Sequence, residues 1–465
     1  MSYFSDLLSL YIKESPYNIK HLANESQLDR TIIQKYISGN RFPSSYSNIE
    51  KIISHLTLTN QQKCDLKKAY HIEKFGIEQY QYLLKIKSII ENMHLIEPIS
   101  FSTEYQFEIN KSFALNLEEL LTFTHMLLDD AQKTNHKLKI CLPTSNKLYK
   151  LIKNAVCLND SLSLDHLLYL ENDTLKYKDM YNLIQFENCF PTLLSNKCII
   201  KYMYLQSIST LETKNMYPYS IHSQNYSLLI NSQLNLGILL KNDINQHLHL
   251  QFDKTFNNAY FYNHYYQSNL GYLSLHSLFN NKLHTYFLLQ RKPGILFALD
   301  KDMIDRHFIG NNDQYQELLN YLNHYKKHIT NILSSHELHF YFTRSGLLEF
   351  IKSGISYDLP LSLMTPFDNE EINFILHRLV NINKHYHNFY LHLIKEDFKI
   401  PSHCSIAYQQ DNEILFILKD EQHYHGFILD ETTIKKEFFN LKHLMDIENF
   451  VYSEKETIQF LKEFI

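Results

Sequence analysis

The first 75 residues constrain the fold of this 465-residue chain most, because apolar residues recur there at helical spacing between closely placed helix breaks. One stripe follows the three-and-four spacing of an amphipathic helix and consists of Phe4, Leu7, Leu8, Tyr11 and Ile12. Asn18 and Asp29 precede further stripes, and both are good caps for helix N-termini. The pattern predicts several short helices in succession.

Four more helices follow from the same reasoning. The third must stop near Gly39, Pro43 with Ser44 and Ser45 opens the fourth, and the fifth begins near Asn60. The residues predicted to face inward from the second, third and fourth helices are Ile19, Leu22, Ala23, Ile33, Tyr36, Ile37, Ile49, Ile52, Ile53 and Leu56. Five short helices in this space predict a compact all-α bundle.

The stretch from residue 22 to 44 resembles the helix-turn-helix of the lambda-repressor-like (Xre/Cro) family of transcriptional regulators. The resemblance rests on the spacing L-A-x-x-x-x-(apolar)-(cap)-x-x-x-I, followed by "ISGNRFPS". Leu22 and Ala23 match the packing pair of the family's second helix, and Leu28 matches its buried turn residue. Ile33 matches the core anchor of the recognition helix, and Gly39 matches the stop after it.

This resemblance implies double-stranded DNA as the partner, with a recognition helix in the major groove. It places Arg30, Thr31, Gln34 and Lys35 at base edges, where Arg and Lys donate to guanine and Gln pairs with adenine. Arg41 and Ser44 fall where phosphate contacts are expected, and such contacts set the register.

Two positions depart from the family pattern. Gln27 occupies the turn position where the family usually has Gly, and a left-handed backbone is less comfortable for Gln. Ile19 replaces the Gln that commonly begins the second helix. The alternative is a bundle that has lost DNA binding and mediates protein contacts, but Arg30, Gln34, Lys35 and Arg41 favour DNA.

Charge is also uneven along the chain. Residues 1–75 hold ten Lys and Arg and seven Asp and Glu, a net charge of +3, whereas the remainder carries −8. A small basic head on an acidic body is typical of a polyanion-binding module joined to a different function.

The rest of the chain predicts a helical connector and a mixed α/β body. The connector has two interpretations: its apolar face (Tyr80, Leu83, Ile86, Ile90 and Met93) either pairs two protomers or packs on the body. Beyond it, strand and helix patterns alternate, and "HLHLQF", "NNAYFYN" and "GILFALD" are among the predicted strands. We predict an α/β multidomain protein: a helix-turn-helix domain (1–75), a connector (76–132) and two α/β sensor lobes (133–320 and 321–465). No internal repeat is recognised.

Chemical motifs are scarce in the body. Gly-rich nucleotide loops, a G-x-S-x-G elbow and H-E-x-x-H are all absent from the sequence. Alternating His pairs would share a strand face, and these are His247 with His249, His385 with His387, and His423 with His425. His392 or His264 would be third ligands, but ordinary half-exposed strand positions are favoured. We therefore predict no metal, no cofactor and no catalytic residues.

One aromatic run in the body has two interpretations. The run "AYFYNHYY", from Ala259 to Tyr266, would either line a ligand pocket or form a strand with one face in the core. The strand is the favoured interpretation, and the sequence identifies no ligand.

Composition restricts the setting of the protein. The six Cys include no C-x-x-C pair, no apolar run is long enough to span a membrane, and no basic, apolar leader is recognised. The nine Gly residues and the scarce Val are typical of an AT-rich genome, such as that of a low-GC bacterium or its mobile elements. We expect a cytoplasmic protein.

These observations together predict a sequence-specific DNA-binding transcriptional regulator that acts as a homodimer. Its α/β body would sense a small-molecule or peptide effector or bind a protein partner. One alternative is an enzyme whose activity resides in the body, while the head targets it to DNA or controls its own gene. The other is an adaptor whose head recruits a protein.

Overall fold

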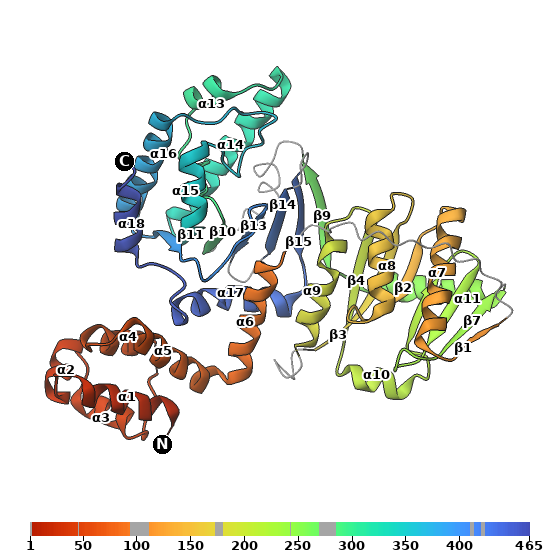
Figure 1. Ribbon diagram of the computed structural model, residues 1–465, viewed down its shortest axis with the longest axis horizontal. Coiled ribbons are helices and arrows are strands. Elements are labelled where there is room, and N and C mark those ends of the chain that lie inside the picture. The colour runs from red at the N-terminus through yellow and green to blue at the C-terminus, as the bar shows by residue number, and fades with distance from the viewer. Residues whose placement is uncertain are drawn as a thin grey trace. The chain divides into compact units, whose positions relative to one another are not determined.

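The computed structural model describes residues 2–44, 46–93, 111–172, 180–241, 243–268, 285–409, 413–419 and 424–465 (Figure 1). It confirms a mixed α/β protein and divides into two compact units. Unit 1 comprises Met1–Ser88, Ile394–Phe398 and Asn440–Tyr452, and unit 2 comprises the remainder. Among the described residues, no helix has both the length and the apolar character needed to cross a membrane.

Unit 1 contains the short helices predicted for the N-terminal region. They are α1 (Tyr3–Glu14), α2 (Ile19–Ser26), α3 (Arg30–Ile37), α4 (Tyr46–His55) and α5 (Asn60–Phe75). The predicted caps are confirmed, because Asn18 accepts the His21 N–H at 2.9 Å and Asp29 accepts the Thr31 N–H at 2.6 Å. The inward faces of these helices form one apolar core, in which Phe4, Leu22 and Ile33 are almost wholly buried.

Residues close to the C-terminus complete unit 1. Asp446, in the last turn of α17 (Thr432–Ile447), accepts a hydrogen bond from the Tyr46 hydroxyl and lies 2.6 Å from the Lys67 ammonium. Glu448 accepts a hydrogen bond from the Tyr80 hydroxyl. Unit 1 is therefore larger than the 75-residue head, since a distant part of the chain belongs to the same unit.

The connector is a helix, α6 (Ile77–Glu91), which follows a left-handed residue, Gly76 (φ 95°). The five apolar connector residues named in the sequence analysis are all at most 4% exposed within the single chain. This burial supports packing within the protein and leaves that face unavailable to a second protomer.

Sheet A, in unit 2, has the strand order β1-β7-β6-β5-β2-β3-β4-β8. Its strands are β1 (Phe113–Ala114), β2 (Leu138–Cys141), β3 (Leu164–Glu171), β4 (Cys198–Leu205), β5 (Tyr219–His222), β6 (Tyr226–Ile230), β7 (Gly237–Lys241) and β8 (Tyr260–Phe261). β2, β3 and β4 are parallel, with α8 (Lys147–Leu158) and α9 (Tyr181–Leu193) between them, and the other pairs are antiparallel. The remaining helices here are α7 (Leu117–Thr134), α10 (Ile208–Lys214) and α11 (Asp243–Asn258).

Sheet B, also in unit 2, has the strand order β12-β11-β10-β13-β14-β15-β9. Its strands are β9 (Asn263–Ser268), β10 (Tyr286–Gln290), β11 (Leu338–Thr343), β12 (Phe389–Ile394), β13 (Cys404–Gln409), β14 (Ile414–Lys419) and β15 (Tyr424–Leu429). The described helices that accompany it are α13 (Lys301–His307), α14 (Asn312–Leu333), α15 (Arg344–Ser353), α16 (Asn369–His385), α17 and α18 (Glu454–Lys462).

The two sheets repeat one topology, which corrects the reading that the chain holds no internal repeat. Adding eight to the numbers in the order β4-β3-β2-β5-β6-β7-β1 gives the order of sheet B. The repeat extends to register, since Ser220 lies opposite Cys141 at the end of β2 and Ser405 lies opposite Gln290 at the end of β10. Burial alternation and strand order are compatible with many sequences, so the repeat left little trace in residue identity.

Tyr262 is the point at which the chain leaves sheet A for sheet B. Its N–H donates to the Ile200 carbonyl in sheet A at 3.0 Å, and its carbonyl accepts the Asp430 N–H, just after β15, at 2.9 Å. An aromatic cluster also joins the two halves of unit 2. The ring centroids of Phe186 and Phe416 are 5.6 Å apart, and those of Phe190 and Phe427 are 5.5 Å apart. α9 of the first half thus packs on strands of the second.

Two of the predicted strands were wrong. "HLHLQF" lies inside α11, where its apolar residues follow a helical stripe that includes Phe252 and Phe256. "GILFALD" (294–300) forms turns and no strand. The Ile295 N–H donates to the carboxylate of buried Asp358 at 2.8 Å, where a strand residue would bond a neighbouring strand. β9 and β10 belong to sheet B and not to the predicted first lobe (133–320), because the chain changes sheets at Tyr262.

The phenylalanine cluster generates a stability prediction. Phe416 is fully buried against Phe186, Phe190, Phe427 and Phe438, so Phe416→Ala leaves a cavity and should lower the free energy of unfolding by about 3–5 kcal/mol. Urea denaturation followed by circular dichroism measures this change. Phe374→Ala is the control, because Phe374 is 43% exposed. An equal loss in both variants would contradict the cluster's role as a core.

Candidate nucleic-acid interface

The turn between α2 and α3 fixes the angle between these helices. Gln27 adopts the left-handed conformation, with φ 55° and ψ 32°, which is less comfortable for Gln than for the Gly expected at this turn position. The Leu28 N–H then donates to the Ala23 carbonyl at 3.2 Å, and the Leu28 side chain packs against the core. A left-handed residue followed by a buried one reverses the chain within three residues and delivers Asp29 to the start of α3.

α3 has one buried and one exposed face. Ile33 and Tyr36 are at most 1% exposed and anchor the helix in the core. The four residues assigned to base edges are all exposed, and they are Arg30, Thr31, Gln34 and Lys35. They occupy the first six residues of α3, at the spacing that places side chains on neighbouring parts of one helical surface.

The segment after α3 exposes the two residues assigned to phosphates. Gly39 takes a left-handed conformation with φ 70°, and the Arg41 N–H donates back to the Lys35 carbonyl at 3.2 Å. This turn holds Arg41 close to the end of α3, and both Arg41 and Ser44 are exposed. Ser45, predicted to help open α4, lies outside the described residues.

The cations on this surface differ in their pairing from those of α5. Arg30, Lys35 and Arg41 have no ion-pair partner in the part of the chain that the structure describes. In contrast, Lys67 of α5 pairs with Asp446 at 2.6 Å, and Lys68 lies 3.9 Å from Glu448. Uncompensated positive charge in unit 1 thus includes the residues singled out from the sequence.

Asp29 is a carboxylate beside these cations, and its hydrogen bonds are made to the start of α3. Hydrogen bonds from the Thr31 side chain and backbone lower the pKa of Asp29, and the charge of Lys35 lowers it further. A carboxylate that stays ionised at a helix N-terminus interacts favourably with the helix dipole. Asp29 therefore orders the first turn of α3, where Arg30 and Thr31 lie.

One exposed cation near this surface was not singled out from the sequence. Lys20 is exposed in the first turn of α2, while its neighbour Ile19 packs against the core. The apolar stripe that identified Ile19 and Leu22 as inward residues also assigns Lys20 to the outer face, which is the signal that would have found it.

The His pairs do not form a metal site in the described structure. His247 and His249 lie on a helix, where residues two apart point in different directions, and His249 bonds the Ser223 carbonyl at 2.8 Å. His385 ends α16 with His387 beyond it, and His423 lies outside the described residues. His392 bonds His339 at 3.0 Å. No group of three or more His, Cys, Asp or Glu side chains among the described residues has metal-binding geometry.

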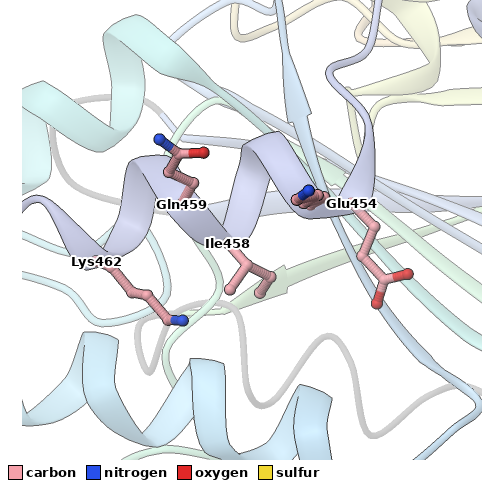
Figure 2. A pocket seen from close by; sticks show the side chains of 5 residues that line it. Glu454, Ile458, Gln459 and Lys462 are labelled. Atoms are coloured by element: carbon pink, nitrogen blue, oxygen red, sulfur yellow. The ribbon is translucent and has the colours of Figure 1, made fainter.

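A cavity of about 460 Å³ lies along α18 (Figure 2). Ile458 and Lys462 point to one side of the helix and Gln459 points to the other. The described lining residues all come from this one helix, so they form a single wall and bring no set of chemical groups together.

The strained turn leads to a stability prediction. A left-handed backbone costs a non-Gly residue roughly 1–2 kcal/mol. Gln27→Gly should therefore stabilise unit 1 by about 1 kcal/mol after the entropy cost of Gly. Hydrogen exchange of the α2 and α3 amides, read by mass spectrometry, measures the change. Glu25→Gly is the control, because Glu25 lies inside α2 and its replacement should destabilise the helix. Faster exchange in Gln27→Gly would contradict the prediction.

Comparison with known proteins gives only distant likenesses. No protein-family model and no curated protein sequence matches the chain. Among solved structures, the chain is similar to TrmBL2, described as an archaeal chromatin protein with a novel mode of DNA binding, at 10% identity and a TM-score of 0.22. That match covers 56% of this chain and 93% of TrmBL2. Polyphosphate kinase from Porphyromonas gingivalis matches at 11% identity and a TM-score of 0.21, over 69% of this chain and 48% of the kinase. At these TM-scores neither likeness bears on function.

Proposed function

We propose that unit 1 binds double-stranded DNA sequence-specifically, in the manner of an Xre/Cro-type helix-turn-helix, and that the protein regulates transcription. The observation that carries this proposal is the exposed face of α3, where Arg30, Gln34 and Lys35 do not pack into the apolar core. Such donors are the side chains that read base edges in the major groove.

The roles of the individual residues follow from their chemistry. Arg30 and Lys35 donate to guanine, Gln34 pairs with adenine, and Thr31 contacts either kind of base. Arg41 and Ser44 hold phosphates and so fix where α3 lies along the duplex. Two protomers would read two half-sites, and their contact surface must lie outside the buried face of α6.

The α/β body is proposed to sense a small-molecule or peptide effector. α17 is continuous from Thr432 in unit 2 to Ile447 in unit 1, so a change that reaches its first turn is covalently connected to the Asp446 contacts. Glu431 caps that first turn by accepting the Ile434 N–H at 2.7 Å. An effector need only favour one arrangement of α17 to change operator affinity, typically by about 1–3 kcal/mol.

The test is binding of the purified full chain to genomic DNA fragments at two salt concentrations. Arg30→Ala/Gln34→Ala/Lys35→Ala removes two charges and three donors from α3. The matched control, Lys13→Ala/Lys51→Ala, removes two exposed charges from α1 and α4. Because each good bidentate base contact contributes about 1–3 kcal/mol, the α3 variant should lose at least about 100-fold in affinity for its selected sites. The control should keep its sequence preference.

Two outcomes would overturn the proposal. One is the absence of any selected sequence with the wild-type chain, and the other is equal loss in both variants. Weakening of Arg41→Ala on all sequences, with a shallower dependence on salt, is the expected signature of a phosphate contact. Capture of a protein partner that the α3 variant loses, without DNA selectivity, would assign the surface to an adaptor.

A further inference from the structure

A cavity of about 380 Å³ lies in unit 2 beside the point where the chain passes from sheet A to sheet B. Residues from two stretches line it: 196–199, at the start of β4, and 261–266, from β8 into β9. The second stretch belongs to the aromatic run that the sequence analysis singled out as a ligand pocket or an ordinary strand. The structure gives that run a cavity as well as a strand.

Aromatic rings form one wall of this cavity. The ring centroids of Phe261 and His264 are 5.3 Å apart at an angle of 35°, and Phe261 is 44% exposed although it is fully apolar. The Lys201 ammonium lies over the Phe261 ring, 4.4 Å from its centroid, and Lys201 itself is buried. This cation–ring contact stabilises Phe261 where it lies, with part of its ring left accessible to a ligand.

Three polar side chains also belong to this cavity. Asn196, His264 and Tyr266 line it, and within the described ranges none of their side chains has a hydrogen-bond partner. Burial and the nearby Glu413 carboxylate raise the pKa of Tyr266, so its hydroxyl keeps its proton and can donate. An amide, an imidazole and a phenol supply both donors and acceptors.

The cavity also borders a strand edge, and its described lining residues are uncharged. β9 is the last strand in the order of sheet B, so its outer backbone groups have no strand partner among the described residues. No Asp, Glu, Lys or Arg is among the described lining residues. The two charges that act on lining residues have opposite signs, Lys201 beside Phe261 and Glu413 near Tyr266. A ligand held here would therefore be recognised mainly by stacking and by neutral hydrogen bonds.

We propose that this cavity binds an uncharged, planar nitrogen heterocycle of purine-nucleoside size. Its volume lies in the lower part of the roughly 300–1,000 Å³ range typical of small-molecule sites. Aromatic side chains stack on any heteroaromatic ring, and the ring's edge nitrogens match the Asn196, His264 and Tyr266 groups. Such a ligand would contact both β4 of sheet A and β9 of sheet B, and it would be the effector of the proposed regulator. Binding itself requires no DNA, so it is tested separately.

The experiment uses the full chain with adenosine and guanosine as probes. Saturation-transfer NMR detects contact with the purine protons, and isothermal titration calorimetry measures affinity. Phe261→Ala, His264→Ala and Asn196→Ala should each weaken binding, by about tenfold or more for the two ring variants because stacking is lost. Tyr260→Ala is the matched control, because Tyr260 precedes Phe261, is 67% exposed and does not line the cavity. It should bind like the wild type.

A charge comparison separates this site from a phosphate site. Adenosine monophosphate should bind no more tightly than adenosine, and ribose should not bind. The proposal is overturned if neither nucleoside binds at millimolar concentration, if all three cavity variants bind like the wild type, or if Tyr260→Ala loses as much affinity as Phe261→Ala. Much tighter binding of the monophosphate would also overturn it. Because no DNA is present, failure here leaves the DNA-binding result untouched, and the reverse also holds.

Discussion

Tyr262 is the residue on which the arrangement of unit 2 depends. Its N–H is bound by sheet A and its carbonyl is bound beside sheet B, so the two hydrogen bonds of one peptide segment tie the repeats together. Tyr262 is fully buried, and a buried backbone group without a partner is costly, so the chain has little freedom at this crossing. Tyr262 thereby fixes β8, which precedes it, and β9, which follows it. Each of these strands lies at the edge of its sheet, so their aromatic side chains lie at the sheet edges.

The repeated topology also shows where the two halves of the body differ. In the first repeat, the helix after the last antiparallel strand is α11, which packs within unit 2 through Phe252 and Phe256. In the second repeat the corresponding helix is α17, whose final turns belong to unit 1. One copy of the motif thus completes its own half, while the other copy supplies the acidic residues that bind Tyr46, Lys67 and Tyr80.

The helices of unit 1 were predictable because caps and apolar stripes are local sequence features. Much of the strand pairing in unit 2 was not, because it joins residues that are distant in the sequence. Asn18, Asp29 and the apolar stripes specify helix ends and faces within a few residues, and the structure has those helices where they were expected. Asp446 lies 379 residues from Lys67, and no pattern in a single sequence reports such a pairing. "HLHLQF" alternates like a strand over six residues, but the helix it belongs to is specified by spacing over sixteen. For the candidate interface, helical periodicity was enough to predict the exposure of Arg30, Thr31, Gln34, Lys35, Arg41 and Ser44.

Charge pairing in unit 1 distinguishes the proposed interface from the surface of α5. Asp446 and Glu448 offset the charges of Lys67 and Lys68, which would otherwise attract phosphates to α5. Arg30, Lys35 and Arg41 have no such partner among the described residues, so α3 and the turn after it keep their attraction for phosphates. Attraction between charges acts before any hydrogen bond forms, and it orients a protein as it approaches a polyanion. The same acidic residues that join the C-terminal segment to unit 1 would therefore reduce non-productive binding through α5, because they offset the charges of Lys67 and Lys68.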